Sequence, residues 1–510
     1  MKQYIMIPVL VTLLALMLPA CDVTRAPHDG VPVDQALNTV EGLQNVTRGN
    51  YAYLKDQTAN TNNLVMMLYQ PGDYRSDDLM ISGTTSNRMM LVYNYLHNAD
   101  MPNVTNLWRN AYRLIYNANT VVDAITPGES AELDQLRGEN QFLRSLMHLH
   151  LVTGFARPYS HGRDNLGIPI VQVPDLEGQP ERATVGAVYD FLVDDLTEAA
   201  SLMGSDKPSS YGSKEAALAL LSRVYLYMEE NELANETADL VIDSGRYELV
   251  DTETLPAYFT INNELRSESI FAIRHVMPAD DHGRNHGVGS MIYQTASGAG
   301  WGENYVSEAY RNLIDQHPTD VRRQFIEPQY ERDENGDIIM ENGEPVLRTR
   351  NGFPRYYVNK FNFLEGTETG NSPELIRYSE IWLNKAEALA KLGREEEALD
   401  IVNMFRERAG IPASAHYSLG DLGDHDTVLD VVLEERRLEL LFEGHRAHDI
   451  YRNKRDLFRD YPGTHLAPGN PGVDVEAGTQ FISWESPRII FQIPEQELEL
   501  NPNLVQNPLN

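Results

Sequence analysis

The sequence predicts a mostly α-helical protein, in which a helical scaffold is joined to a loop-rich, irregular part with a few short β-hairpins. Over long stretches, apolar residues recur three and four positions apart, which is the period of a helix with one buried face. Between residues 246 and 372 this period is lost, and glycine, asparagine, proline and aromatic residues are frequent. A single cysteine among 510 residues excludes an internal disulfide, so the fold depends on buried apolar area.

The scaffold is expected in three blocks of the chain, about 33–56, 106–245 and 373–455. The central block is divided by turn-forming segments such as Thr126-Pro127-Gly128. The periodic segments predict helices over residues 33–56, 107–125, 133–155, 185–203, 214–245 (a helix pair), 373–410 and 427–453.

Irregular structure is expected over about 57–105 and 246–372, and residues 456–510 are expected to be loop-like. The terminal segment contains one candidate strand, Arg488 to Ile493, which is rich in β-branched residues.

One helix pair of the last block has a recognisable spacing of residues. Trp382 and Ala386 precede Gly393, and Ala398 begins the next periodic run. Small residues at such positions let two helices approach closely, and the spacing resembles the tetratricopeptide pattern of paired helices. Residues 217–242 repeat it more loosely, so the sequence predicts a tetratricopeptide-like scaffold.

Two turn dipeptides, Asn335-Gly336 and Asn342-Gly343, predict a β-hairpin within the long irregular segment. The acidic residues around them, Asp333 and Asp337 among them, also resemble part of a calcium-binding loop. An EF-hand loop has glycine at its sixth position, where this chain has Ile338, so the hairpin is the favoured interpretation. Structural calcium is the only cofactor that the sequence leaves open.

The chain begins with a targeting segment, residues 1–20. Lys2 is followed by an apolar run from Ile5 to Leu18, which is shorter than a membrane-spanning helix, and small residues then lead to Cys21. A cysteine at the cleavage point resembles a bacterial lipoprotein signal. We therefore expect Cys21 to be the lipidated first residue of the mature body, residues 21–510, which a lipid anchor ties to a membrane outside the cytoplasm.

The chain is strongly acidic, because 75 Asp and Glu residues against 42 Lys and Arg residues give a net charge of −33. This balance argues against nucleic acid as a partner, since basic side chains make the phosphate contacts. Salt screens the self-repulsion of such a surface, so the composition suits a saline habitat, although solubility alone also explains it.

Charged residues of the last predicted helix offer two interpretations. Glu443, Arg446 and Asp449 lie on adjacent turns, where they make either an acid/base pair around an arginine or a structural ion-pair network. The spacing of three favours the structural network. His445 and His448 share a helix face, but no further ligand accompanies them, so no metal site is predicted.

The same region carries a family resemblance. Residues Glu434–Arg446, followed by Asp449-Ile450-Tyr451-Arg452, closely resemble the "ERR-EL-FEG-R--DL-R" helix of the SusD/RagB family of nutrient-binding outer-membrane lipoproteins. The end of the chain, with Leu500-Asn501-Pro502-Asn503 and Gln506-Asn507-Pro508, is similar to the terminal signature of that family.

This resemblance implies a function without chemistry in the protein itself. Family members bind a nutrient, usually a glycan and sometimes a peptide, and deliver it to a SusC-type TonB-dependent outer-membrane transporter, over which they sit as a lid facing the outside. We therefore expect no enzyme. The alternatives are a tetratricopeptide-type scaffold lipoprotein of outer-membrane assembly and a surface glycosidase, which requires two carboxylates opposed across a cleft.

Ligand contacts are expected from two loops. Trp301 stands in a glycine-rich, polar segment with Tyr305 four residues on, and exposed aromatic faces stack on sugar rings. The alternative is that Trp301 plugs its loop against the scaffold. The second loop contains four candidate residues, for which a solvated charged loop is the alternative: Tyr74, Arg75, Asp77 and Asp78.

Overall fold

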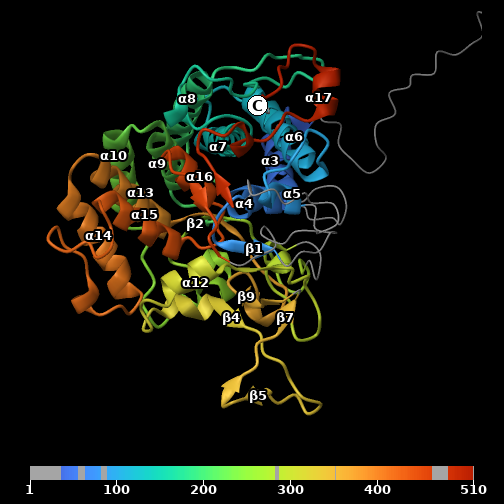
Figure 1. Ribbon diagram of the computed structural model, residues 1–510. Helices are drawn as coiled ribbons and strands as arrows, with labels where there is room; N and C mark the ends of the chain where they lie inside the picture. The colour runs from blue at the N-terminus through green and yellow to red at the C-terminus, as the bar shows by residue number, and fades with distance from the viewer. Residues whose placement is uncertain are drawn as a thin grey trace, which may run out of the picture.

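A computed structural model of the chain describes residues 36–55, 64–81, 89–281, 287–350, 352–461 and 480–508. The structure is mostly helical, with only short strand pairs, which confirms the predicted fold class (Figure 1). Residues 1–20 and Cys21, where the leader and the lipid anchor are predicted, lie outside the described residues.

Most predicted helices are observed close to their expected ends. They are α3 (Val40–Lys55), α6 (Pro102–Ala124), α7 (Ala131–Phe155), α8 (Val185–Leu202), α9 (Lys214–Met228), α10 (Asn231–Ile242), α13 (Tyr378–Lys391), α14 (Glu395–Arg408), α15 (Val428–Glu439) and α16 (Arg446–Arg452). Further helices lie in segments that were predicted to be irregular or loop-like: α4 (Leu64–Tyr74), α5 (Met90–Tyr93), α12 (Glu308–Ile314) and α17 (Glu495–Leu500).

The long helices pack in chain order. Helices α6 to α10 each contact the next, and α10 then packs on α13, which also contacts α14 and α15. Side-chain caps define where several of them begin: Ser130, Thr184 and Ser213 each accept a hydrogen bond from the backbone N–H three residues on. The resulting helical layer forms the upper and left part of Figure 1.

Helices α13 and α14 form the helix pair predicted from the tetratricopeptide-like spacing. Ala386 and Ala398 are fully buried between the paired helices, where a larger side chain would separate them. Gly393 has a φ of 75° at the turn, a conformation that glycine adopts without strain.

The strands form isolated antiparallel pairs. These are β1 (Leu79–Ile81) with β3 (Asn304–Val306), β2 (Ser269–Ala272) with β10 (Glu374–Arg377), β4 (Ile326–Pro328) with β9 (Tyr356–Val358), β5 (Met340–Glu341) with β6 (Glu344–Pro345), β7 (Thr349–Arg350) with β8 (Phe353–Pro354), and β11 (Leu457–Phe458) with β12 (Phe481–Ile482).

The predicted hairpin is present, and β5 lies in a projection at the bottom of Figure 1. It turns at Asn342-Gly343, where both residues have positive φ. The Asp333 carboxylate accepts hydrogen bonds from the N–H groups of Asn335 and Asp337, at 2.8 and 2.9 Å, so it closes the preceding turn. Among the described residues, no group of three or more acidic, histidine or cysteine side chains is placed to hold a metal ion.

The prediction of one continuous helix over residues 427–453 is wrong. The chain leaves α15 at Glu439 and re-enters a helix at Arg446, and Phe442 and Gly444 between them have positive φ. The cause is tertiary, since Gly444 lies directly against α4. A Cβ atom on Gly72 would lie 1.8 Å from the Gly444 carbonyl oxygen, so the two glycines permit a backbone contact that a continuous helix would not make.

Two further predictions are corrected. Arg488 to Ile493 is not a strand, because Pro487–Ile489 is a 3₁₀ turn and the Phe491 N–H donates to the carbonyl of Gly154 in α7. The segment 57–105 is also less irregular than expected, since it contains α4. This helix is buried along its whole length, so it lacks the polar face from which periodicity is recognised.

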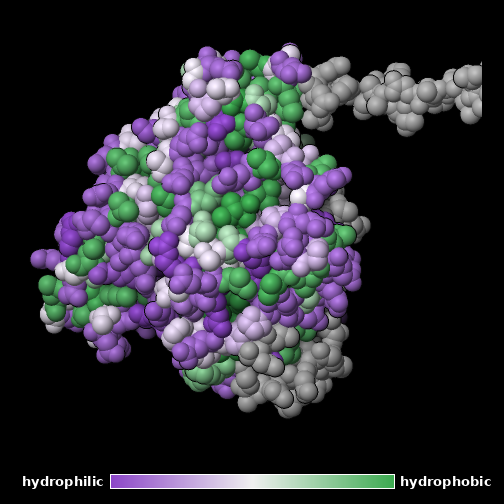
Figure 2. Space-filling model, turned by 90° about the horizontal axis from the view of Figure 1, so that it is seen from above, coloured by the Kyte–Doolittle hydropathy of each residue, from purple (hydrophilic) through white to green (hydrophobic). Residues whose placement is uncertain are grey.

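The molecular surface is predominantly hydrophilic on the face seen in Figure 2, where apolar residues gather in smaller patches. This agrees with the acidic composition. Within the described ranges, no helix has both the length and the apolar character that crossing a membrane requires.

The buried histidine of α7 makes stability depend on pH. Burial lowers the pKa of His148 to about 3, and two hydrogen bonds, between Nδ1 and the Arg144 carbonyl at 2.7 Å and from the Val171 N–H to Nε2 at 3.3 Å, suit only the neutral ring. The unfolded chain takes up this proton below about pH 6.5, whereas the folded chain does so only near pH 3.

We therefore expect His148 to lower the free energy of unfolding by about 2 kcal/mol when the pH falls from 7 to 5. Chemical denaturation of wild type and His148→Asn at both pH values measures the effect. The variant should lose less stability than wild type over this interval, and an equal loss would contradict the assignment.

Candidate functional site

The segment between α15 and α16 is the centre of a network of buried charges. Glu443 accepts hydrogen bonds from Lys360 at 2.5 Å and from Arg377 at 2.7 Å, and all three side chains are at most 3% exposed. Burial opposes ionisation of the Glu443 carboxyl, but the charges of Arg377 and Lys360 outweigh it and hold its pKa below the usual range. The carboxylate is therefore charged and fully engaged by the protein.

The network continues into α15. Glu439 pairs with Arg377 at 2.7 Å and with Arg408 at 2.5 Å, and Glu435 pairs with Arg322 at 2.7 Å. Burial opposes the charge on Glu439, yet the arginines, Arg408 first, hold its pKa well below the ordinary value. These pairs join α14 and α15 to strand β10.

The predicted network of Glu443, Arg446 and Asp449 is ionic, but the three residues do not pair with one another. Asp449 pairs with Arg436 at 2.8 Å and Arg452 at 2.7 Å. Arg446 reaches across to the loop after α4, where it donates two hydrogen bonds to Asp77, at 2.8 and 3.0 Å. The local pairing that helical spacing favours is therefore replaced by pairs between distant segments.

The loop after α4 is not an exposed binding loop. Tyr74 and Arg75 are at most 2% exposed, and Arg75 donates to the carbonyls of Pro71 at 2.8 Å and Ile489 at 2.5 Å. Asp77 and Asp78 are both buried and pair with Arg437, at 3.2 and 2.6 Å. The prediction that these four side chains face a ligand is wrong, because all four are buried and bonded within the protein. The aspartates join this segment to α15, and the Tyr74 hydroxyl accepts a hydrogen bond from Asn304.

The glycine-rich loop separates its two predicted aromatic residues. Tyr305 lies in β3 and is fully buried, so the prediction of an exposed stacking ring at this position is wrong. Successive side chains of a strand point to opposite faces. The Tyr305 ring packs in an aromatic cluster with Tyr293 and Tyr357. Trp301, in contrast, is 38% exposed.

The loop that carries the exposed Trp301 reaches a polar cleft of about 470 Å³ in the loop-rich part, which Gly298 of that loop helps to line although Trp301 itself does not. Gly300 and Gly302 flank it at positive φ and press the loop onto the cleft wall, since a Cβ atom on Gly300 would lie 2.4 Å from the Tyr293 carbonyl oxygen and one on Gly302 2.7 Å from the Tyr357 hydroxyl. Both tyrosines line the cleft. The glycines thus hold the backbone on both sides of Trp301 against these two tyrosines.

The rest of the cleft lining comes largely from strand β4 and the chain that follows it. Glu327 accepts hydrogen bonds from the Tyr293 hydroxyl at 3.2 Å and from Gln329 at 2.9 Å, which fixes its orientation. Glu331 and Arg348 form an ion pair at 3.9 Å, with each side chain 46% exposed. Acceptors, donors and a charged pair are therefore presented to one hollow next to aromatic rings, an arrangement suited to binding a polyhydroxylated molecule.

Sequence reasoning missed the cleft residues contributed by β4 and the chain that follows it, including half-buried Tyr330. The sequence marks these residues only weakly as part of a site. Gln329 and Tyr330 follow a three-residue strand and precede the hairpin, and a tyrosine among polar residues is the one feature that sets them apart. The cleft forms only because β4 pairs with β9, which brings Glu327 opposite Tyr357.

Comparison with known proteins gives a consistent result for both ends of the chain. Residues 334–509 match the model of the SusD family, and residues 33–226 match a family described as starch-binding and associating with the outer membrane. SusD-like protein P2 of Formosa agariphila is 24% identical over an alignment of 526 positions that covers 98% of each chain.

Solved structures have the same fold. A SusD superfamily protein from Bacteroides thetaiotaomicron is 28% identical, with a TM-score of 0.76, over 94% of this chain and 100% of the other. A laminarin-binding SusD-like protein is 22% identical, with a TM-score of 0.68, over 91% of this chain and 98% of the other. At this lower identity the likeness concerns the fold alone.

The buried network gives a graded prediction for stability. Glu443→Ala leaves the buried charge of Lys360 without a carboxylate partner and removes one partner of Arg377, which should lower the free energy of unfolding by about 3–5 kcal/mol. Arg394→Ala removes an exposed ion pair with Glu397 and should leave the free energy of unfolding nearly unchanged. Urea denaturation of both variants and wild type measures the difference.

Arg446→Ala should fall between these two, because its side chain is 20% exposed and Asp77 keeps Arg437 as a partner. A variant at Glu443 or Arg446 that unfolds like wild type but loses ligand binding would show that the residue belongs to the binding site instead.

Proposed function

The chain belongs to the SusD/RagB family, and on that premise we propose that it is an outer-membrane lipoprotein that binds a glycan at the Trp301 cleft and delivers it to a SusC-type TonB-dependent transporter. The observation that carries the proposal is the cleft itself, where tyrosine rings lie next to fixed donors and acceptors and the loop with the exposed Trp301 forms part of the lining. Sugar rings present apolar C–H faces and a ring of hydroxyl groups, which need this combination.

The class of ligand is supported by the relatives. The family matched by residues 33–226 is described as starch-binding, and a protein of the same fold binds laminarin, so glycans are the first ligands to test. The two carboxylates of the cleft already have partners: Glu327 accepts a hydrogen bond from Tyr293, and Glu331 forms an ion pair with Arg348. We therefore propose binding and delivery as the role of the protein, with no catalytic step.

The membrane arrangement follows from the leader. Lipidation of Cys21 would anchor the protein while leaving the folded body outside the membrane, and a transporter partner would receive the bound glycan. The same lid role for peptides is the main alternative, and it is tested by offering peptides beside glycans.

Stacking on Trp301 is the first test. Trp301→Ala should weaken binding of the recognised oligosaccharide about thirtyfold, which corresponds to a loss of about 2 kcal/mol. Isothermal titration calorimetry against defined oligosaccharides, including laminarihexaose and maltohexaose, and against mixed peptides measures this. Trp484→Ala is the matched control, because Trp484 is a partly buried tryptophan that packs against His161 away from the cleft.

Equal affinities of Trp301→Ala and wild type would remove the residue from the site. A lowered melting temperature in Trp301→Ala would show that the tryptophan is a structural plug of its loop. Binding of peptides in place of glycans would change the proposed ligand class while keeping the lid role.

Anchoring gives a second test. Cys21→Ala should abolish lipidation and release the protein from the outer-membrane fraction into the soluble fraction, because a lone protein surface lacks the hydrophobic anchor. Fractionation is done in cells that lack the transporter, so that the partner does not retain the protein. A variant that still sediments with the outer membrane there would contradict the proposed anchor.

A further inference from the structure

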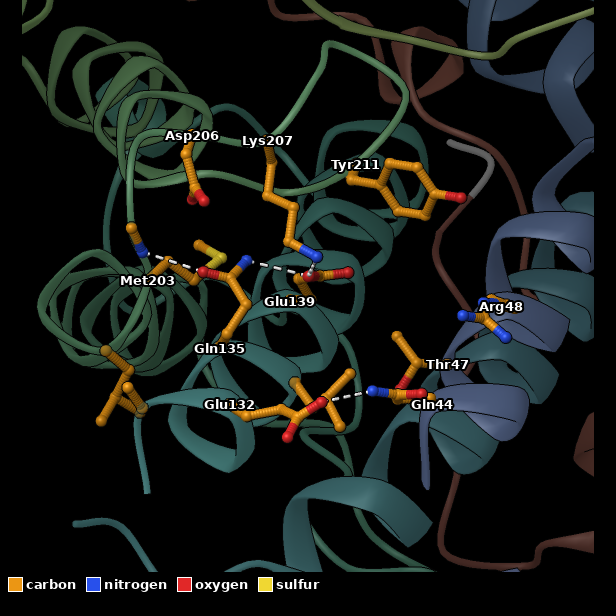
Figure 3. Close-up of a pocket in the computed structure, with 14 residues that line it drawn as sticks. Gln44, Thr47, Arg48, Glu132, Gln135, Glu139, Met203, Asp206, Lys207 and Tyr211 are labelled. Atoms are coloured by element: carbon orange, nitrogen blue, oxygen red, sulfur yellow. Dashed lines mark hydrogen bonds and ion pairs between the residues drawn. The ribbon is translucent and has the colours of Figure 1, made fainter. Parts of the chain in front are cut away.

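A second cavity lies in the helical scaffold, and none of its lining residues belongs to the Trp301 cleft. It has a volume of about 580 Å³, within the range of ligand pockets, and we call it the scaffold pocket. Its walls are α3, the first half of α7 and the loop between α8 and α9, whereas the cleft is built from residues 293–357. Figure 3 shows side chains from all three elements arranged around one hollow.

The floor of the scaffold pocket is a fixed polar group. Glu139 is 1% exposed, and its carboxylate accepts hydrogen bonds from Gln135 at 2.8 Å and from the Tyr51 hydroxyl at 2.9 Å, with Lys207 at 3.5 Å. The Gln135 side-chain oxygen in turn accepts from the Gly204 N–H at 2.9 Å. These bonds hold the α8–α9 loop against α7, so the pocket is built in the folded protein.

The rim presents groups that retain capacity for further hydrogen bonds. Gln44 donates to Glu132 at 2.5 Å across the gap between α3 and α7, and Arg48 uses one guanidinium nitrogen on Asn45 at 3.1 Å. A guanidinium has five N–H donors and a carboxylate has about four acceptor positions, so both ends of this rim have hydrogen-bonding groups left for a ligand.

One wall of the scaffold pocket is aromatic. Tyr211 is half-buried, and its ring is held edge-on by Tyr51 at a centroid distance of 5.0 Å, with the Lys207 ammonium 5.6 Å from the ring centre. The same tyrosine also lines a neighbouring cavity of about 190 Å³, to which Lys55 and Glu264 contribute. The two cavities therefore adjoin at this tyrosine.

We propose that the scaffold pocket is a second binding site for a neutral oligosaccharide, with Tyr211 as the stacking surface and Arg48, Lys207 and Glu132 as partners of its hydroxyls. Charges of both signs line the pocket, so it suits a ligand with alternating donors and acceptors better than a simple anion or cation. The ligand class rests on the proposed function of the Trp301 cleft, but the site rests on its own geometry. Two sites on one body would hold a long glycan more firmly than either alone.

Protection of Lys207 from chemical acetylation tests this site separately from the cleft. The Lys207 side chain is 37% exposed in the empty pocket and would be covered by a bound saccharide. The full protein is treated with an N-hydroxysuccinimide acetate with and without laminarihexaose or maltohexaose, and modified lysines are quantified by mass spectrometry. At a saccharide concentration ten times its Kd, we expect acetylation of Lys207 to slow about tenfold.

Exposed lysines outside the pocket, Lys214 and Lys454, are the internal controls and should react at the same rate with and without saccharide. Trp301→Ala should leave the protection of Lys207 intact, whereas Arg48→Ala, which changes an exposed rim residue, should reduce it. Lys207 reacting equally fast when the cleft is saturated would overturn the second site and leave the cleft proposal standing. If no oligosaccharide binds anywhere on the protein, both proposals fall.

Discussion

Burial of the Glu443 carboxylate between Lys360 and Arg377 is the interaction on which much of this structure depends. The three side chains come from the segment after α15, from the chain following β9 and from the end of β10, so one cluster joins the C-terminal helices to the loop-rich part. Removing charges from water is costly, and only good geometry recovers that cost. The cluster therefore holds these three segments in one relative position.

The Trp301 cleft depends on this position. Lys360 follows three residues after Tyr357, which belongs to β9 and lines the cleft, and β9 pairs with β4, which carries Glu327. The Lys360 ammonium also lies 4.7 Å from the centre of the Phe259 ring, which limits its movement further. A loop-built site thus obtains the rigidity of the scaffold through a few short strands, although the strands themselves are only two to four residues long.

The helical scaffold could be predicted from the sequence because apolar residues of a buried helix face recur three and four positions apart. The sequence also predicted Trp301 as an exposed side chain because flanking glycines and polar neighbours mark a loop outside the core.

The sequence did not predict the partners of charged residues: Arg446 meets Asp77, 369 positions away, and spacing within a helix contains no information about such a pair. Buried Asp78 and Arg437 likewise look like solvated residues in sequence, because composition does not reveal that two charges are buried together. The cleft residues of β4 could not be predicted because β4 and β9 meet only in the folded chain.

The distribution of charge bears on what the protein binds. Interior acidic residues such as Glu439 and Glu443 are matched by arginine and lysine, whereas the chain as a whole carries a net charge of −33. The excess negative charge must then lie largely toward solvent, where it repels polyanions over about 8 Å at physiological ionic strength and over shorter distances in saltier water. In the cleft, Arg348 is paired with Glu331 and offers little net attraction for an anion. These terms favour neutral glycans over sulfated or uronate-rich ones, since stacking on an aromatic face and hydrogen bonding to hydroxyls do not require a charged ligand.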